Sequence, residues 1–322
     1  MNIIITGVAG FIGSNLLKKL LEDGHRVSGI DNFSYGSPVN IDEFKNNPQF
    51  IFFERDLRNP NAFEGIKGEI LVHLASQKIP RYTNALRTLN DNYQMLHHAV
   101  NKCLQDKIKL IYASTSDVYG KNPDSIYSET SDLVLGPTKV KRWAYAISKI
   151  YGEQYIIANH DEHQLKYTIT RFFGSYGPKQ NLSWWGGPQS VFINNSIQNI
   201  PLEIHGDGLQ TRVFTFIDDL IDGLSKCLFE KKSENEIFNI AGRPDEEITI
   251  LDLANLIWRL INNNTAVPLN YISYDSFGNY EDVKRKVPDI SKLKKMLGYE
   301  PNYSLEEGLI RTIEWQKKYM NQ

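Results

Sequence analysis

The chain has 322 residues, of which 41% are hydrophobic and 23% charged, and its formal net charge is -2. This balance allows a large core in two domains or one α/β unit, and it lacks the basic stripe of nucleic-acid-binding proteins. The distant cysteines Cys103 and Cys227 have no metal-spaced neighbours, which argues against a zinc site or disulfide framework and favours the cytoplasm. No run approaches the ~18 apolar residues of a membrane span, so we expect no membrane partner.

The first half of the chain alternates short apolar runs with amphipathic segments, a pattern typical of an α/β protein with a parallel sheet. After Gly174, glycine and proline turns break the chain into shorter elements, which predicts a second, smaller lobe. The predicted strands are Ile3–Thr6, Arg26–Ile30, Phe50–Phe53, Ile70–Leu74, Lys109–Ala113 and Tyr167–Arg171. The predicted helices are Phe11–Glu22, Leu89–Leu104, Lys141–His160, Asp218–Phe229, Ile250–Ile261 and one near Leu305–Tyr319.

Three glycines, Gly7, Gly10 and Gly13, follow the first predicted strand and open the first predicted helix. Glycine lets the backbone approach a pyrophosphate closely and leaves the N–H groups of the helix start free to bind it. The next strand ends at Asp31, whose carboxylate can bind an adenosine ribose and would repel a 2′-phosphate. The pattern therefore predicts a site for NAD rather than NADP. A turn without a ligand, with Asp31 as a strand-end residue, is the alternative.

Two segments in the middle of the chain carry side chains suited to proton transfer. Tyr145 and Lys149 lie four apart in a segment expected to be helical, so the phenol and the ammonium project from one face. The cation favours the phenolate, and Thr115, at the end of a predicted strand, can share a substrate proton with Tyr145. Taken one by one, these residues equally fit surface neighbours and a Ser/Thr-rich turn.

Further short motifs accompany these in a fixed order along nearly the whole chain. In order, the motifs are Thr6-Gly7-Val8-Ala9-Gly10-Phe11-Ile12-Gly13, Asp31-Asn32, Asp56-Leu57, His73-Leu74-Ala75, Thr115…Tyr119-Gly120, Tyr145…Lys149, Arg171-Phe172-Phe173, Tyr176-Gly177-Pro178, Gly206-Asp207-Gly208…Gln210-Thr211-Arg212, Phe216-Ile217-Asp218-Asp219 and Pro288-Asp289-Ile290-Ser291-Lys292.

This combination resembles the extended short-chain dehydrogenase/reductase family, in its nucleotide-sugar epimerase and dehydratase branch. The resemblance implies a Rossmann-type doubly wound parallel sheet with a smaller C-terminal substrate-binding lobe. We expect the NAD-binding domain over residues 1–173, with residues 215–240 returning to it, and mainly the substrate-binding lobe over residues 174–322. Because the family commonly dimerises by pairing two helices of each subunit, we also expect a homodimer, through roughly Leu89–Leu104 and Lys141–His160.

The resemblance also implies roles for individual residues. Tyr145 would be the base, Lys149 its partner and Thr115 the third member of the triad, with Asp117 as a further catalytic candidate. Arg212 would bind the substrate diphosphate, with a surface ion pair to Asp218 or Asp219 as the alternative. The residues expected to bind NAD are Gly7, Gly10, Phe11, Ile12, Gly13, Asp31, Asn32, Asp56, Leu57, Leu74, Ala75, Asn92, Tyr145, Lys149 and Phe172. Those expected to bind the substrate are Ser76, Thr115, Ser116, Gly174, Trp184, Trp185 and Arg212.

The reaction that follows the first oxidation depends on Asp117. In this branch Tyr145 would take a proton from a sugar hydroxyl, and the resulting 4-keto sugar can then be epimerised, dehydrated or decarboxylated. Our main expectation is a nucleotide-sugar 4-epimerase. Thr115-Ser116-Asp117 resembles the Thr-Ser-Glu of GDP-mannose dehydratases and UDP-glucuronate decarboxylases, so a 4,6-dehydratase or uronate decarboxylase acting through Asp117 is the alternative. Asp117 could instead cap its turn, and a non-catalytic NAD sensor is an alternative of another class.

Three features depart from the family pattern or leave it undecided. Gly174 stands where the family often has an asparagine that contacts the substrate, and Phe277-Gly278-Asn279-Tyr280 lacks the arginine that many members use to bind the diphosphate. Trp184 and Trp185 could stack on a sugar or base, or simply pack a loop against the core. We expect His73 to be structural.

Overall fold

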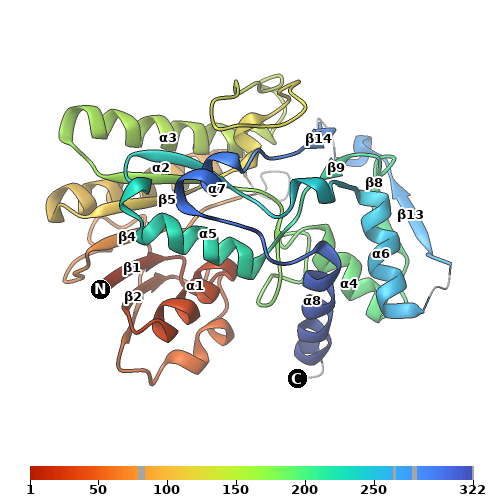
Figure 1. Cartoon of the computed structure of the whole chain (residues 1–322), viewed down its shortest axis with the longest axis horizontal. Helices are drawn as coiled ribbons and strands as arrows, with labels where there is room; N and C mark the ends of the chain where they lie inside the picture. Colours follow the sequence, from red (N-terminus) through yellow and green to blue (C-terminus); the bar gives the residue numbers. More distant parts are fainter. Residues whose placement is uncertain (79–83, 264–265, 278–280, 321–322) are drawn as a thin grey trace.

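The computed structural model describes residues 1–78, 84–263, 266–277 and 281–320, which are built around a seven-stranded sheet (Figure 1). Every neighbouring pair in it is parallel, in the order β3-β2-β1-β4-β5-β6-β11. The order reverses beside β1, where a doubly wound sheet opens a crevice beyond its carboxyl ends. The strands are β1 (Asn2–Thr6), β2 (Arg26–Asp31), β3 (Phe50–Glu54), β4 (Ile70–His73), β5 (Lys109–Thr115), β6 (Tyr167–Phe172) and β11 (Glu236–Ile240).

Helices cover both faces of this sheet, so its central strands are buried on both sides (Figure 1). One face carries α2 (Ala85–Asp106) and α3 (Trp143–His163), which pack against each other. The other carries α1 (Phe11–Glu22) and α5 (Ile217–Phe229). This arrangement is the Rossmann-type α/β fold that the sequence predicts.

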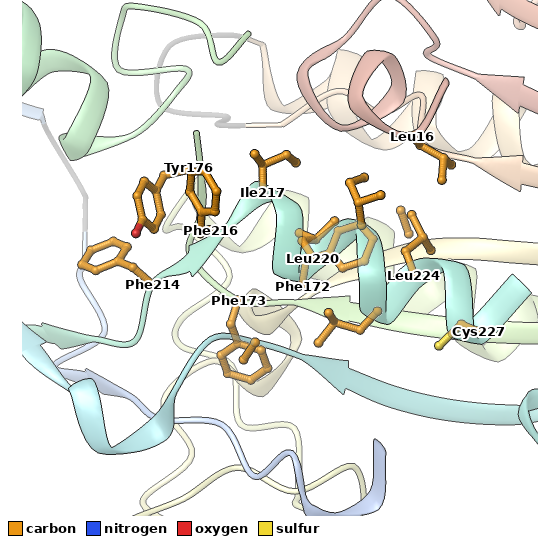
Figure 2. Close-up of a cluster of buried hydrophobic side chains, with 14 of the residues drawn as sticks. Leu16, Phe172, Phe173, Tyr176, Phe214, Phe216, Ile217, Leu220, Leu224 and Cys227 are labelled. Atoms are coloured by element: carbon orange, nitrogen blue, oxygen red, sulfur yellow. The ribbon is translucent and has the colours of Figure 1, made fainter. Parts of the chain in front are cut away.

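The core beneath α5 fixes the strand end that leads into the crevice (Figure 2). Leu220, Leu224 and Cys227 recur at helical spacing along α5, and all three side chains are fully buried. They share one hydrophobic cluster with Leu16 of α1 and Phe172 at the end of β6. Burying each large apolar side chain contributes roughly 1.5–3 kcal/mol. The C-terminal half of the chain therefore helps to hold Phe172, whose neighbours in sequence enter the crevice.

Shorter elements form a group beside the carboxyl ends of the main sheet (Figure 1). Gly187 has a φ of 100°, a backbone conformation that suits glycine, and Pro188 directly after it starts α4. The remaining helices are α4 (Pro188–Ile197), α6 (Ile250–Asn262), α7 (Ser291–Leu297) and α8 (Leu305–Met320). The remaining strands are β7 (Ser175–Tyr176), β8 (Leu202–His205), β9 (Thr211–Arg212), β10 (Thr215–Phe216), β12 (Ile248–Thr249), β13 (Leu269–Ile272) and β14 (Arg285–Lys286).

The predicted elements of the first half agree closely with the structure. Helix α1 has the predicted bounds, and the predicted strands end within two residues of the observed ones. Helix α2 begins at Ala85, earlier than predicted, because Asn84 accepts a hydrogen bond from the Leu86 N–H and caps it. The predictions omit α4, α7 and every strand after β6, including β11 of the central sheet and the four-residue β8 and β13. The other missed strands have only two residues and carry no periodic signal. The division into two lobes stays a prediction.

Candidate active site

A cavity of about 1110 Å³ lies beyond the carboxyl ends of the central strands. Its walls come from the glycine turn before α1, the ends of β4 and β5, the start of α3 and the chain from residue 174 to residue 189. Residues near β9 and β14 close the remaining side. Large concave sites at the switch point of a parallel sheet are where such folds bind ligands.

The glycine turn leaves room that only glycine allows. Gly7 has a φ of +72°, and a Cβ on it would lie 2.9 Å from the Ala75 backbone nitrogen. A Cβ on Gly13 would clash with the Gly7 carbonyl oxygen, so α1 can start this close to β1 only without a side chain there. The turn therefore presents bare backbone to the cavity, as the pyrophosphate of a dinucleotide requires.

Asp31 holds this turn while facing the cavity. Its Oδ2 accepts a hydrogen bond from the Ala9 N–H at 3.0 Å, and its Oδ1 accepts one from the Phe33 N–H at 2.8 Å. Burial raises the pKa of Asp31, and these two backbone bonds oppose the rise. Farther along the wall, a hydrogen bond from Arg58 lowers the pKa of Asp56 to about 2. Carboxylates at these places fit the ribose and adenine half of NAD.

Tyr145, Lys149 and Thr115 meet at the centre of the cavity wall. The Tyr145 hydroxyl hydrogen-bonds to the side chains of Thr115 and Ser76. Lys149 is 3% exposed, and its ammonium donates to the Ala113 carbonyl at 2.7 Å. The phenol, the ammonium and the hydroxyl predicted from separate segments thus converge, as proton transfer requires.

The charges around this group set its protonation. Burial, and then the charge of Asp117, raise the pKa of Tyr145 above its ordinary value, and hydrogen bonds with Thr115 and Ser76 oppose that rise. Burial lowers the pKa of Lys149 to about 7, although Glu153 opposes the shift. A cation beside the phenol is therefore needed before Tyr145 can act as a base near neutral pH, and the nicotinamide of NAD⁺ would supply one.

Asp117 lies in a cluster of cations that the sequence does not reveal. It forms an ion pair with Lys286, the last residue of β14, and another with Arg142 Nη2 at 3.3 Å. Burial alone would raise the pKa of Asp117, but Lys286 and Arg142 hold it well below its usual range. Burial likewise lowers the pKa of Lys286 to about 8, against the effect of Asp117. The turn is capped by Thr115 rather than by Asp117, because Thr115 Oγ1 accepts a hydrogen bond from the Asp117 N–H at 3.2 Å.

Arg212 faces the cavity, but its partner differs from the predicted alternatives. Its Nη2 donates to Asp282 Oδ1 at 3.0 Å, and the same oxygen accepts from Arg142 Nη1 at 2.7 Å. Asp219, one of the carboxylates that the sequence suggested, instead accepts from the backbone N–H groups of Asn302 and Tyr303. One carboxylate, Asp282, therefore links the arginine expected to bind the diphosphate with the arginine beside Asp117.

The two tryptophans have different surroundings, although both line the cavity. The Trp184 ring stacks on His205 at 4.2 Å and packs edge-on against Phe192. The Trp185 ring lies 4.6 Å from the ring of Tyr35, which follows β2. Trp184 thus combines core packing with a cavity face, and Trp185 bridges the two sides of the cavity.

Most of the predicted site residues line the cavity, and two do not. The Leu57 side chain is 4% exposed and lies in the core, and only its carbonyl is used, by His98 Nδ1. Asn92 bonds to the Gln77 backbone and to Ser148, behind the wall. Residues 278–280 lie outside the described residues. The predicted residues that line the cavity are Gly7, Gly10, Phe11, Ile12, Gly13, Asp31, Asn32, Asp56, Leu74, Ala75, Ser76, Thr115, Ser116, Asp117, Tyr145, Lys149, Phe172, Gly174, Trp184, Trp185 and Arg212.

Sequence reasoning missed the charged residues that complete the site. Arg142 lies three residues before Tyr145, a spacing that places it near the same helix face and could have been noticed. Lys286 and Asp282 come from the far end of the chain and carried no signal of their own. In the described part of the chain, no group of three or more potential metal ligands gathers.

Comparison with known proteins places this geometry in a family. The NAD dependent epimerase/dehydratase family matches residues 3–241. A UDP-N-acetyl-alpha-D-glucosaminuronate decarboxylase of Bacillus cytotoxicus is 32% identical and is covered over 98% of its length by 99% of this chain. The UDP-glucuronic acid decarboxylase 1 of Danio rerio is 32% identical, over 97% of this chain and 72% of its own.

Solved structures show the same fold. The UDP-glucose 4-epimerase of Thermotoga maritima, with UDP-glucose, has a TM-score of 0.87 and 29% identity over 99% of this chain and 100% of its own. The UDP-glucuronic acid 4-epimerase of Bacillus cereus, in complex with UDP-glucuronic acid and NAD, has the same TM-score, identity and coverage.

The fold and the site thus define an NAD-dependent enzyme with a Rossmann-type domain. The chain belongs to the NAD dependent epimerase/dehydratase family, whose relatives act on nucleotide sugars. NAD is its cofactor, and the glycine turn and Asp31 fit that cofactor. None of the helices between residues 1 and 320 that the structure describes is long and apolar enough to cross a membrane.

Proposed function

We propose that the protein is an NAD-dependent decarboxylase of a nucleotide-linked uronic acid. The observation that carries this proposal is the cation cluster around Asp117, formed by Lys286 and Arg142 with Arg212 close by. The sequence alone favoured a 4-epimerase and left a dehydratase or decarboxylase acting through Asp117 as the alternative.

The cluster suits a substrate with a carboxylate on its sugar. Three cations, Arg142, Arg212 and Lys286, share two carboxylates, Asp117 and Asp282, so positive charge is in excess. A diphosphate would engage Arg212, as the resemblance implies. That leaves Arg142 and Lys286 beside Asp117 to face an anionic substituent at C6, and the similarity to two uronate decarboxylases supports the same assignment.

The residues of the chain can carry out each proton step. Bound NAD supplies reversible oxidation at the sugar C4. The Tyr145 phenolate accepts the proton of the C4 hydroxyl, while Thr115 orients it. The C4 ketone lies β to the carboxylate, so the C5–C6 bond breaks, CO₂ leaves and the electron pair enters the C4–C5 enolate. Lys286 then donates a proton to C5, and Tyr145 returns its proton as C4 is reduced.

The proposed reaction takes up one proton and releases one CO₂, with no net oxidation of the sugar nucleotide. A 4,6-dehydratase would instead need a base at C5, and Asp117 is a weak base because Lys286 and Arg142 hold its pKa well below the usual range. A sensor of NAD without catalytic activity would not need a proton-transfer group, and here one is assembled from Tyr145, Lys149 and Thr115.

The experiment is to incubate the purified protein with UDP-, GDP- and dTDP-linked sugars, with and without a C6 carboxylate, and to analyse the products by mass spectrometry. We expect loss of CO₂ from a uronic acid and from no neutral sugar, and no turnover by Tyr145→Phe with NAD still bound. An unchanged mass with altered stereochemistry would establish the 4-epimerase instead. Loss of water would establish the dehydratase.

We propose further that two copies pair through the outer faces of α2 and α3. Tyr93 of α2 and Tyr151 of α3 are 44% and 42% exposed, and their rings meet edge-on at 5.6 Å. Leu86 and Ile147 extend this apolar face. A surface of this kind favours burial against a second copy.

The cytoplasmic location expected from the cysteines stays a prediction.

A further inference from the structure

A buried carboxylate that touches neither the cavity nor any reacting atom lies directly behind the proton-transfer group. Glu153 is 3% exposed and follows Lys149 by one helical turn on the same face of α3. Its Oε1 accepts from Ser114 Oγ at 2.5 Å, and both of its oxygens accept from Arg171, Oε1 from Nε at 3.0 Å and Oε2 from Nη2 at 2.6 Å.

Ser114 occupies a particular place in β5. The residue before it, Ala113, supplies the carbonyl that binds the Lys149 ammonium at 2.7 Å. The residue after it, Thr115, hydrogen-bonds to Tyr145. By holding Ser114, Glu153 therefore fixes the short stretch of strand on which both Lys149 and Tyr145 depend.

We propose that Glu153 is a positioning residue for proton transfer, which holds the end of β5 against α3 and keeps the charge of Lys149 in place beside Tyr145. The inference rests on the proposed role of Tyr145 as the base. It goes beyond that role by assigning a function to a residue outside the cavity.

The charges around Lys149 explain why such a residue is needed. Lys149 faces the rings of Tyr112 in β5 and Tyr145 in its own helix, and His73 of β4 lies nearby with its pKa lowered by burial. Neither Tyr112 nor His73 carries a negative charge near neutral pH. Glu153 is the carboxylate that favours the ammonium, since it opposes the drop in the pKa of Lys149 that burial causes.

Arg171 makes the role testable, because it can be removed together with Glu153. Glu153→Gln alone would leave the Arg171 guanidinium, 4% exposed, without a counter-charge and could prevent folding. In Glu153→Gln/Arg171→Met both charges are absent, and such replacement of a buried pair is often neutral for stability. Tyr119→Phe is the matched control, because the Tyr119 hydroxyl binds Arg171 Nη1 at 2.9 Å on the side away from Ser114.

The experiment titrates Tyr145 in the NAD-loaded protein, by the ultraviolet absorbance difference between each variant and the same variant carrying Tyr145→Phe. We expect the phenolate signal to move to higher pH by about 1 unit or more in the double variant, because Lys149 then loses its proton more readily. Glu153→Asp, which keeps a carboxylate, should show a smaller movement of the phenolate signal to higher pH than the double variant does. Tyr119→Phe should leave the signal in place.

A folded, NAD-bound double variant that titrates as the unaltered protein does would overturn the role of Glu153 and leave the proposed function standing. If Tyr145 titrates like an ordinary phenol even in the unaltered protein, its role as base and that of Glu153 both fail. No sugar is present in this measurement, so an error in the substrate assignment does not affect it.

Discussion

Asp117 and Lys286, separated by 169 positions in the chain, form a direct ion pair at the wall of the cavity. The pair joins the turn after β5 to β14 and places an ammonium at the cavity wall, where the proposed reaction needs a proton donor for the sugar C5. Because burial lowers the pKa of Lys286 to about 8, its proton is available near neutral pH and is lost above that value.

Removing this ammonium should slow decarboxylation selectively. We expect Lys286→Met to reduce kcat by roughly 10²–10⁴-fold, the usual contribution of a positioned acid, while NAD stays bound. The measurement is the rate of CO₂ release across pH, for which activity should fall above about pH 8 in the unaltered enzyme. Asp117→Asn should move this fall to lower pH, because the carboxylate raises the pKa of Lys286. An alkaline limit that is the same in Asp117→Asn would rule out Lys286 as the acid.

In the glycine turn, packing and helix propensity have opposite effects on the stability of a Gly→Ala variant. In most helices Gly→Ala is stabilising by roughly 0.5–1 kcal/mol. At Gly13 the added Cβ would press on the Gly7 backbone, and overpacking costs about 1–3 kcal/mol. We therefore expect Gly13→Ala to lower the free energy of urea unfolding and to abolish NAD binding. Gly10→Ala, whose Cβ would lie 3.2 Å from one carbonyl, is the milder control; equal stability of the two variants would contradict the argument.

Trp185 should help to retain NAD. Its ring contacts Tyr35, and the same two segments are tied again by the ion pair of Lys179 with Glu43 at 2.8 Å. These contacts join two segments that line the cavity, so we expect them to slow the release of NAD. We expect Trp185→Ala to release NAD at least several-fold faster on dilution, measured by the cofactor remaining after gel filtration, whereas Trp185→Phe should retain it. Equal retention by the alanine variant would show that the contact does not confine the cofactor.

Local interactions of this chain could be predicted from the sequence, whereas those between distant segments could not. The strand–glycine–helix motif and the Tyr145–Lys149 spacing are local, so the sequence predicted the Rossmann-type sheet and the position of Tyr145 on α3. Lys286 and Asp282 reach the cavity only because β14 pairs with β9, a two-residue contact that no periodicity indicates. The sequence could therefore identify Asp117 as a candidate but could not decide its role, which depends on partners from the far end of the chain.

The proposed dimer predicts different outcomes for two similarly exposed isoleucines. Ile147 on α3 is 42% exposed within the apolar face of α2 and α3, and Ile310 on α8 is 41% exposed elsewhere. A charge introduced at an interface must be buried without a partner, which is costly, whereas the same charge in water is tolerated. We expect Ile147→Asp to convert a dimer to a monomer in light scattering and Ile310→Asp to remain dimeric. A monomeric unaltered protein would remove the proposal.

His73 makes the fold sensitive to acid. Its ring is 2% exposed, bonds through Nδ1 to Thr6 Oγ1 at 2.9 Å and stacks on Tyr112. Burial, with a smaller effect of Lys149, lowers the pKa of His73 to about 3, whereas in the unfolded chain it stays near 6.5. Between these values the unfolded state binds the extra proton, so stability must fall as the pH drops from 6.5 towards 3.

The size of this effect can be measured by removing the histidine. At pH 5 the protonation of the unfolded chain costs roughly 2 kcal/mol, from 1.36 kcal/mol for each unit below 6.5. The loss of unfolding free energy between pH 7 and pH 5 should therefore be about 2 kcal/mol smaller in His73→Gln, even if that variant is less stable at both. His163→Gln, on the exposed end of α3, controls for the removal of a histidine. An unchanged acid dependence in His73→Gln would mean that His73 is protonated at pH 5 in the folded protein as well, and would contradict its lowered pKa.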